Sequence, residues 1–236
     1  MPFGDDRAIK LVLDAFEDIG VDRIVLNGDV LDFLNLSLHG PKNPDIQENL
    51  EYEIQSGVDF ISNLRKRFPK EEIIFNAGNH ESRLDRFIIN KVPHFWNILK
   101  VEKILMLEQN NVIFHEYNSR IQLEETNLYF QHSPPSYSSA RAAYLKKLDQ
   151  SSIYGCSHRC ERYTTTGASG AVYETVFNGH LVDAKKHHNV FSYMKGHEQW
   201  QQCVTLVAIK NKKQFHLEQS VIRDYALKLG GNLYEG

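Results

Sequence analysis

A turn with two carboxylates is the first group of residues that could do chemistry. Gly28-Asp29-Val30-Leu31-Asp32 places two aspartates three residues apart, directly after the apolar stretch 23–27. One carboxylate can bridge two divalent metal ions, and a second can orient a neighbouring histidine. The alternative interpretation of this turn is a helix N-cap followed by a solvent-exposed acid.

The segment Gly78-Asn79-His80-Glu81 adds an amide oxygen and an imidazole. Asparagine is a poor residue for the end of a strand unless its side-chain oxygen has a role, and the histidine beside it is placed as a proton donor. The alternative is an Asx-turn that begins a helix at Glu81. Together, the two turns indicate metal chemistry more strongly than either does alone.

Two later segments end in further metal-binding residue types. His132 directly follows the strand-like run 127–131, and Gly155-Cys156-Ser157-His158 follows 152–154. In α/β sheets, ligands gather at the carboxyl ends of strands, because the loops there converge on one edge. The residues that we expect to share one cleft on this basis are Asp29, Asn79, His132 and His158.

Alternating helices and strands are expected to position these residues. Hydrophobic periodicity predicts helices at about 6–19, 45–67 and 138–149, and strands at 23–27, 72–76, 111–115, 127–131, 152–154, 170–177, 202–209 and 214–222. The apolar positions expected to face the core are Ile9, Val12, Leu13, Phe16 and Ile19 in the first helix, and Leu50, Ile54, Val58, Ile61 and Leu64 in the second. The pattern predicts an α/β fold, a layered sandwich of two mixed β-sheets flanked by helices, in a single domain over residues 1–236.

Composition narrows the class of protein. With 236 residues, 42% of them hydrophobic and 24% charged, the chain is not disordered, collagen-like or a coiled coil. It has neither an apolar run of membrane-spanning length nor the features of a secretory signal. A net charge of −3 argues against a module that binds nucleic acid without catalysis. The sparse cysteines Cys156, Cys160 and Cys203 predict reduced thiols and a cytoplasmic protein.

In the order and spacing of its motifs, the chain resembles the calcineurin-like metallophosphoesterases, which include protein phosphatases, nucleases and cyclic-nucleotide phosphodiesterases. The resemblance covers residues 1 to about 160 and rests on Gly28-Asp29-x-x-Asp32, Gly78-Asn79-His80-Glu81, His132 and Gly155-Cys156-Ser157-His158. The segments 82–86 and Trp200-Gln201-Gln202 are similar to bacterial and phage members. The resemblance implies the sandwich fold and hydrolysis of phosphoesters.

The resemblance also implies a metal site. One ion would be held by Asp29, Asn79, His132 and Cys156, where cysteine replaces the family's histidine; only Asp29 and His158 remain for a second ion. We expect Mn²⁺, with Zn²⁺, Fe²⁺ or Mg²⁺ as alternatives, and a thiolate favours zinc or iron over magnesium. We therefore expect at most one bound ion. The alternative for Cys156 is an inert small residue in a degraded site.

Four further residues receive catalytic roles from the resemblance. His80, oriented by Asp32, would protonate the leaving oxygen, and Arg83 or Arg159 would neutralise phosphate charge. The expected substrate is a phosphodiester, such as a nucleotide or nucleic acid. The alternative is a catalytically impaired homologue with a binding or regulatory role.

The family's first motif, Asp-x-His, is missing from this sequence. In similar proteins it precedes a Pro-Phe pair, and here Pro2-Phe3 directly follows Met1. We expect the first strand and two ligands to be absent, either because the native product is longer upstream or because this is a natural short form. Loss of that strand predicts an exposed sheet edge, which is then covered by another segment or used for homo-oligomerisation.

Overall fold

The computed structural model describes residues 2–37, 50–191 and 197–236, and the chain divides into two compact units. The first unit comprises Met1–Gly4, Val21–Tyr117 and Ala184–Lys195. The second comprises Asp5–Gly20, Asn118–Asp183 and Gly196–Gly236. The organisation as a single domain stays a prediction.

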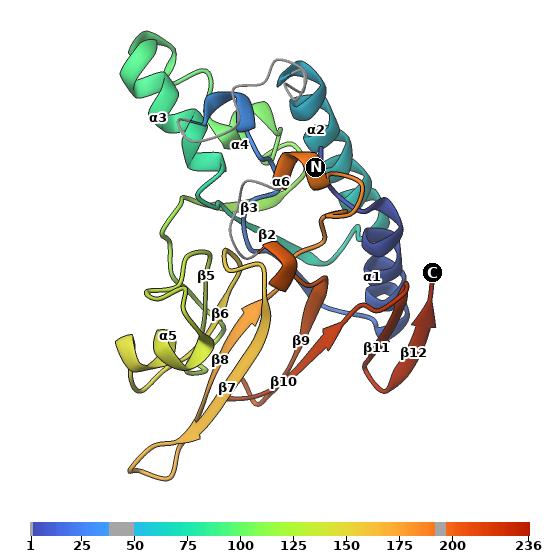
Figure 1. The fold of residues 1–236 in the computed structure, drawn as a ribbon, viewed down its shortest axis with the longest axis vertical. Coiled ribbons are helices and arrows are strands. Elements are labelled where there is room, and N and C mark those ends of the chain that lie inside the picture. Colours follow the sequence, from blue (N-terminus) through green and yellow to red (C-terminus); the bar gives the residue numbers. More distant parts are fainter. Residues whose placement is uncertain (1, 38–49, 192–196) are drawn as a thin grey trace. The chain divides into compact units, whose positions relative to one another are not determined.

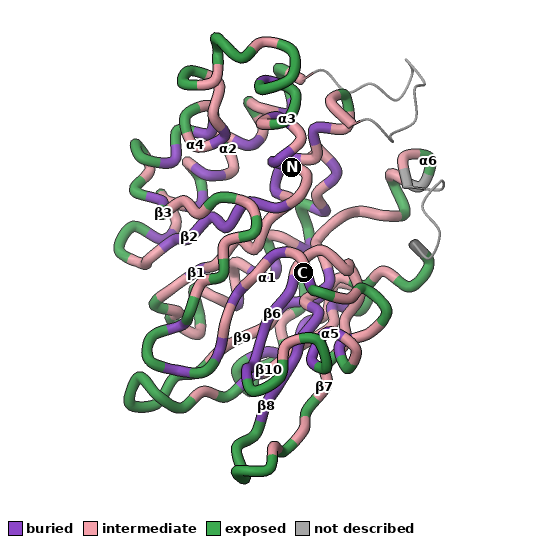
Figure 2. The backbone as a smooth tube through the Cα atoms, turned by 90° about the vertical axis from the view of Figure 1, so that its left-hand side faces the viewer, coloured by how far each residue is buried: buried purple, intermediate pink, exposed green. Residues whose placement is uncertain are grey.

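A parallel sheet is the centre of the first unit. Its three strands lie in the order β1 (Arg23–Leu26), β2 (Glu72–Asn76) and β3 (Val112–His115), of which β2 and β3 are labelled in Figure 1. The helical segments of this unit are η1 (Leu34–Leu36), α2 (Leu50–Arg67), α3 (Glu81–Lys91), η3 (Pro93–Phe95), α4 (Val101–Ile104) and α6 (His188–Phe191). The central strand, β2, is buried from Ile73 to Asn76, in agreement with its apolar sequence (Figure 2).

A mixed sheet organises the second unit. Its five strands have the order β4 (Ile121–Gln122), β5 (Leu128–Gln131), β6 (Ser151–Tyr154), β8 (Val172–Asn178) and β7 (Cys160–Thr166). The pairs β5–β6 and β6–β8 are parallel, whereas β4 and β7 pair antiparallel at the edges. Two antiparallel hairpins, β9 (Cys203–Lys210) with β10 (Gln214–Val221) and β11 (Ala226–Leu229) with β12 (Asn232–Glu235), complete the strands, and α5 spans Ala140–Lys146.

Helix α1 (Asp6–Ile19) belongs to the second unit, and its bounds agree with the prediction. The Asp5 carboxylate caps its start by accepting a hydrogen bond from the Ala8 N–H (3.1 Å), and the helix ends at Gly20. Its buried side chains are Ala8, Leu11, Val12 and Ala15, which pack against the C-terminal hairpins through Val204, Ile222, Leu227 and Leu229. Of the five predicted core positions, only Val12 is among these buried residues.

Two features of the predicted architecture are corrected. The first unit's sheet is wholly parallel, not mixed, and β5 and β6 belong to the mixed sheet of the second unit, where β6 pairs with β8. The helix predicted at 138–149 is shorter, ending at Lys146. The part of the predicted helix before residue 50 lies outside the described residues.

Strand β1 is an edge of its sheet among the described residues, because its hydrogen-bonded neighbour is β2 alone. Self-association across this edge stays a prediction. In the described part of the chain, no helix combines the length and the apolar character that crossing a membrane requires.

Candidate active site

The turn that follows β1 is held by two buried carboxylates. Glu81, at the start of α3, accepts hydrogen bonds from the backbone N–H groups of Asp29 and Leu31 (both 2.9 Å). Glu53, on α2, accepts hydrogen bonds from the backbone N–H groups of Asp32 (2.6 Å) and Phe33 (2.7 Å). Glu81 is 1% exposed and Glu53 is 2% exposed, so both carboxylates are shielded from water. The turn is thus fixed from two helices.

The segment that follows β2 lies against this turn. The backbone N–H of His80 donates to Asp29 Oδ1 (3.0 Å), and the N–H of Gly78 donates to Glu81 Oε2 (2.7 Å). Asn79 is in the same segment, and its carbonyl oxygen accepts a hydrogen bond from the Ser82 hydroxyl (2.8 Å). The first unit therefore brings together the two motifs that the sequence singled out.

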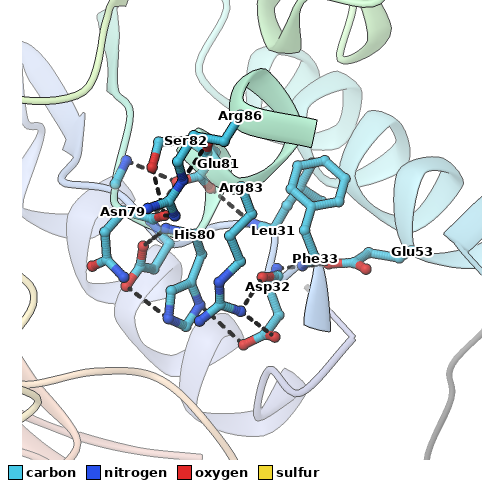
Figure 3. Close-up of polar contacts among 12 residues, drawn as sticks. Leu31, Asp32, Phe33, Glu53, Asn79, His80, Glu81, Ser82, Arg83 and Arg86 are labelled. Carbon is cyan, nitrogen blue, oxygen red and sulfur yellow. Dashed lines mark hydrogen bonds and ion pairs between the residues drawn. The ribbon is translucent and has the colours of Figure 1, made fainter. Parts of the chain in front are cut away.

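His80 and Asp32 form an ion pair at the centre of this arrangement (Figure 3). His80 Nδ1 lies 3.0 Å from Asp32 Oδ2, and His80 Nε2 lies 3.8 Å from Asp29 Oδ2. Burial alone would lower the pKa of His80, but the charges of Asp29 and Asp32 outweigh burial, so this pKa lies above its usual value. Burial would raise the pKa of Asp32, yet His80 and Arg83 hold it below its usual value. Both effects favour the charged pair.

Arg83 is engaged with Asp32. Its Nη1 donates to the carbonyl oxygen of Asp32 (2.7 Å) and lies 3.1 Å from the carboxylate Oδ1 (Figure 3). In this structure Arg83 therefore supports the carboxylate that orients His80, which is a different contact from the phosphate contact that the sequence predicted.

Two donors for metal lie together in the second unit. His132, which is 2% exposed, directly follows β5, and Cys156 follows the neighbouring parallel strand β6. The His132 carbonyl oxygen accepts hydrogen bonds from the N–H groups of Gly155 (3.0 Å) and Cys156 (3.1 Å). A ring nitrogen of His132 and the Cys156 Sγ lie within 4.8 Å of each other.

His158 and Arg159 follow in the same turn of the second unit. The His158 ring packs edge-on against Trp200, with centroids 4.3 Å apart. The Arg159 guanidinium lies 3.1 Å from a Glu161 carboxylate oxygen and donates to the carbonyl oxygens of Tyr137 and Ser138. These contacts anchor the loop before α5, so Arg159 has a structural task in addition to any contact with substrate.

The donor set contains a carboxylate from Asp29, an imidazole from His132 and a thiol from Cys156, residues that could hold a metal ion. Oxygen, nitrogen and sulfur ligands of this kind suit several transition metals, so these three residue types do not select one metal ion. Asp29 and Asn79 belong to the first unit, and His132, Cys156 and His158 belong to the second. A single cleft shared by all five stays a prediction.

Sequence reasoning missed the roles of Glu53 and Glu81. The signal for Glu81 was its place at the end of the Gly-Asn-His-Glu motif, next to a helix N-terminus where an acid is favourable. Glu53 has no such signal in the sequence: the structure places it on the face of α2 that also buries Gly57 and Ile61. An acid on a buried helix face needs polar partners.

A scan of the chain against protein-family models finds no match, and a search of curated proteins finds no relative. The motifs and the chemistry of the residues described above are therefore the basis for a functional proposal.

Proposed function

We propose that this chain is a metal-dependent phosphoester hydrolase of the calcineurin-like kind, with a phosphodiester of a nucleotide or nucleic acid as its substrate. The observation that supports this most directly is the partly buried His80–Asp32 pair, with Nδ1 and Oδ2 3.0 Å apart, next to the carboxylate of Asp29. The preference for a phosphodiester comes from the resemblance to bacterial and phage members.

The donor types fit a divalent metal ion. In the proposal, Asp29, Asn79, His132 and Cys156 hold the ion, and His158 belongs with Asp29 to a second site that is too incomplete to bind an ion tightly. When bound, such an ion polarises the phosphoryl oxygen and lowers the pKa of a bound water molecule. Mn²⁺ is the expected ion, and the Cys156 thiol favours Zn²⁺ or Fe²⁺ over Mg²⁺.

The chain's own residues supply the proton. Asp32 fixes the orientation of the His80 ring through Nδ1, which leaves Nε2 to deliver a proton to the leaving oxygen of the ester. Because the pKa of His80 is raised, the ring keeps its proton at a higher pH than a free histidine does. Arg83 keeps the Asp32 carboxylate in place through Oδ1, the oxygen that does not face His80 Nδ1.

The test compares two phosphodiesters in the presence of Mn²⁺. Bis(4-nitrophenyl) phosphate releases 4-nitrophenolate, a leaving group that needs little protonation. A dinucleotide releases a nucleoside through its sugar oxygen, and this alkoxide leaving group needs a general acid. We expect Asp29→Ala to abolish hydrolysis of both. We expect His80→Gln to slow the dinucleotide reaction by about 10²–10⁴-fold and to affect the nitrophenyl ester much less. His94→Gln, at an exposed histidine of η3, is the matched control.

Two outcomes would overturn the proposal. Wild-type protein that binds Mn²⁺ or Zn²⁺ but hydrolyses neither ester would support an impaired homologue with a binding role. Hydrolysis that Asp29→Ala leaves unchanged would place the activity elsewhere, including in a contaminating enzyme. If His80→Gln slowed hydrolysis of both esters equally, His80 would not be the general acid, but the rest of the proposal would stand.

A further inference from the structure

Glu53 is a buried acid that no motif includes. It is 2% exposed and lies on the face of α2 that also buries Gly57, Ile61 and Leu64. Both of its hydrogen bonds with the turn after β1 reach one carboxylate oxygen, Oε1, which accepts from the N–H groups of Asp32 (2.6 Å) and Phe33 (2.7 Å) (Figure 3). Its polar end is therefore directed at the residue that orients His80.

The turn needs such support because of its backbone. Asp29 and Phe33 have φ angles of 57° and 50°, in the left-handed region that non-glycine residues rarely adopt. Conformations of this kind persist where the surrounding structure over-determines them, and they cluster at functional sites. Here, four of the five backbone N–H groups from residue 29 to residue 33 donate to Glu53 or Glu81.

Asp32 is held at each of its polar groups. Its N–H donates to Glu53, and its carbonyl oxygen accepts from Arg83. Its carboxylate contacts His80 through Oδ2 and Arg83 through Oδ1. The Phe33 side chain, which is fully buried, anchors the next residue. Removal of the Glu53 acceptor would release the backbone of Asp32 while its side-chain partners remain.

We propose that Glu53 is a positioning residue, which fixes the backbone at Asp32 so that the Asp32 carboxylate meets His80 Nδ1. This proposal rests on the proposed function and extends it to a residue outside the motifs. The role needs an acceptor oxygen at the Oε1 position and does not need the negative charge. Glutamine keeps that oxygen, whereas alanine and methionine remove it.

The kinetic test uses dinucleotide hydrolysis with Mn²⁺. We expect Glu53→Ala and Glu53→Met to lower kcat by about 10–100-fold with little change in KM, because substrate binding does not involve Glu53. Methionine fills the space that alanine leaves empty, so it covers the case in which the alanine variant fails to fold. Glu53→Gln is expected to restore most of the lost activity. Glu51→Ala, at an exposed acid of the same helix, is the matched control.

A double-mutant cycle tests whether Glu53 acts through Asp32. If it does, adding Glu53→Met to Asp32→Ala produces little further loss, because the carboxylate that Glu53 positions is already gone. Equal fold losses in the wild-type and Asp32→Ala backgrounds would overturn the proposal. So would a Glu53→Met variant with wild-type kcat.

Amide hydrogen exchange in the metal-free protein provides a readout without catalysis. We expect the N–H groups of Asp32 and Phe33 to be protected in wild-type protein and in Glu53→Gln, and to exchange faster in Glu53→Met. Unchanged protection in a folded Glu53→Met variant would overturn the proposal. If the amide protection follows this pattern but the protein has no hydrolytic activity, the proposed function is overturned. The hydrogen-bonding role of Glu53 would still be supported.

Discussion

Gly78 lies directly against Asp29. A Cβ atom at Gly78 would stand 2.5 Å from the Asp29 backbone nitrogen and closer still to its carboxylate, and real Cβ atoms do not approach other atoms so closely. The two turns that carry the candidate site therefore meet where one of them has no side chain. Any residue larger than glycine at position 78 must displace the carboxylate on which the proposed metal site depends.

Gly78→Ala is expected to lower both stability and activity. Overpacking of this kind costs about 1–3 kcal/mol of unfolding free energy, and the displaced Asp29 carboxylate should reduce hydrolysis beyond the unfolded fraction. Urea denaturation and phosphodiester hydrolysis at a temperature where the variant is folded measure the two effects. Gly170→Ala is the control: its φ of +82° strains a side chain, but nothing lies within 4 Å, so only stability should fall. Full activity in folded Gly78→Ala would contradict the prediction.

Arg83→Gln separates two roles for this arginine. Because Arg83 contacts both the carbonyl and the carboxylate of Asp32, its loss should lower kcat by about 10–100-fold and leave KM nearly unchanged. Steady-state kinetics on a phosphodiester give both constants, with Arg141→Gln at an exposed residue of α5 as the control. A raised KM at unchanged kcat would instead identify Arg83 as a phosphate-binding residue, as the sequence suggested.

Glu53→Gln should stabilise the protein at neutral pH. Burial raises the pKa of Glu53 and the charge of Asp32 raises it further, although the N–H groups of Phe33 and Asp32 act in the opposite direction. A carboxyl whose pKa is raised on folding weakens the folded state once the pH exceeds its unfolded pKa, about 4.3. The gain in Tm of Glu53→Gln over wild type should therefore be present at pH 7 and disappear as the pH falls below about 4. Melting curves from about pH 3 to pH 8 test this, and a pH-independent difference would count against it.

Cobalt binding should depend on Cys156. Thiolate coordination to Co²⁺ produces a charge-transfer absorption in the near ultraviolet, which oxygen and nitrogen ligands do not produce. We expect this band in wild-type protein and in Cys160→Ala, and its loss in Cys156→Ala. A band that persists without Cys156, or that requires Cys160, would show that Cys156 is not a metal ligand.

The thiols of Cys160 and Cys203 should form a disulfide on oxidation. Cys160 on β7 and Cys203 on β9 have their Sγ atoms 2.9 Å apart, within reach of a bond after a small movement. Diamide removes one hydrogen from each thiol and is itself reduced to the hydrazine. We expect the intact mass to fall by two hydrogens and a peptide map to link these two cysteines, with Cys160→Ser as the control. A link that includes Cys156 would contradict the prediction.

The sequence predicted the positions of most elements because hydrophobic periodicity and turn residues are local signals. Strand β2 and helix α1 agree with their predicted bounds, and the Asp32–His80 pair follows the expected order of motifs. The buried faces of helices were predicted less well. Ile61 and Leu64 of α2 are buried as expected, but the stripe continues through Gly57 and Glu53 instead of Val58 and Ile54. Side-chain polarity does not reveal a glycine or an acid that faces the core.

Local signals in the sequence do not determine which strands pair when they are far apart in the chain. Strands β5 and β6 precede candidate metal ligands, as β1 and β2 do, and nothing in their residues shows that they belong to a second sheet, in which β6 pairs with β8. The same holds for Glu53, whose partners lie 20 and 21 residues earlier in the chain. Tertiary contacts determine both cases, so only a three-dimensional structure reveals them.

The hydrogen bonds from Gly155 and Cys156 to the His132 carbonyl have a consequence for how this chain could diversify. They hold the histidine and the thiol in register through the adjacent strands β5 and β6, independently of the length of the connection 133–150 between these strands. That crossover, with α5 inside it, is therefore an exchangeable segment. Grafting loops of other lengths there could create new substrate preferences in a protein engineering library while the two donors stay in register.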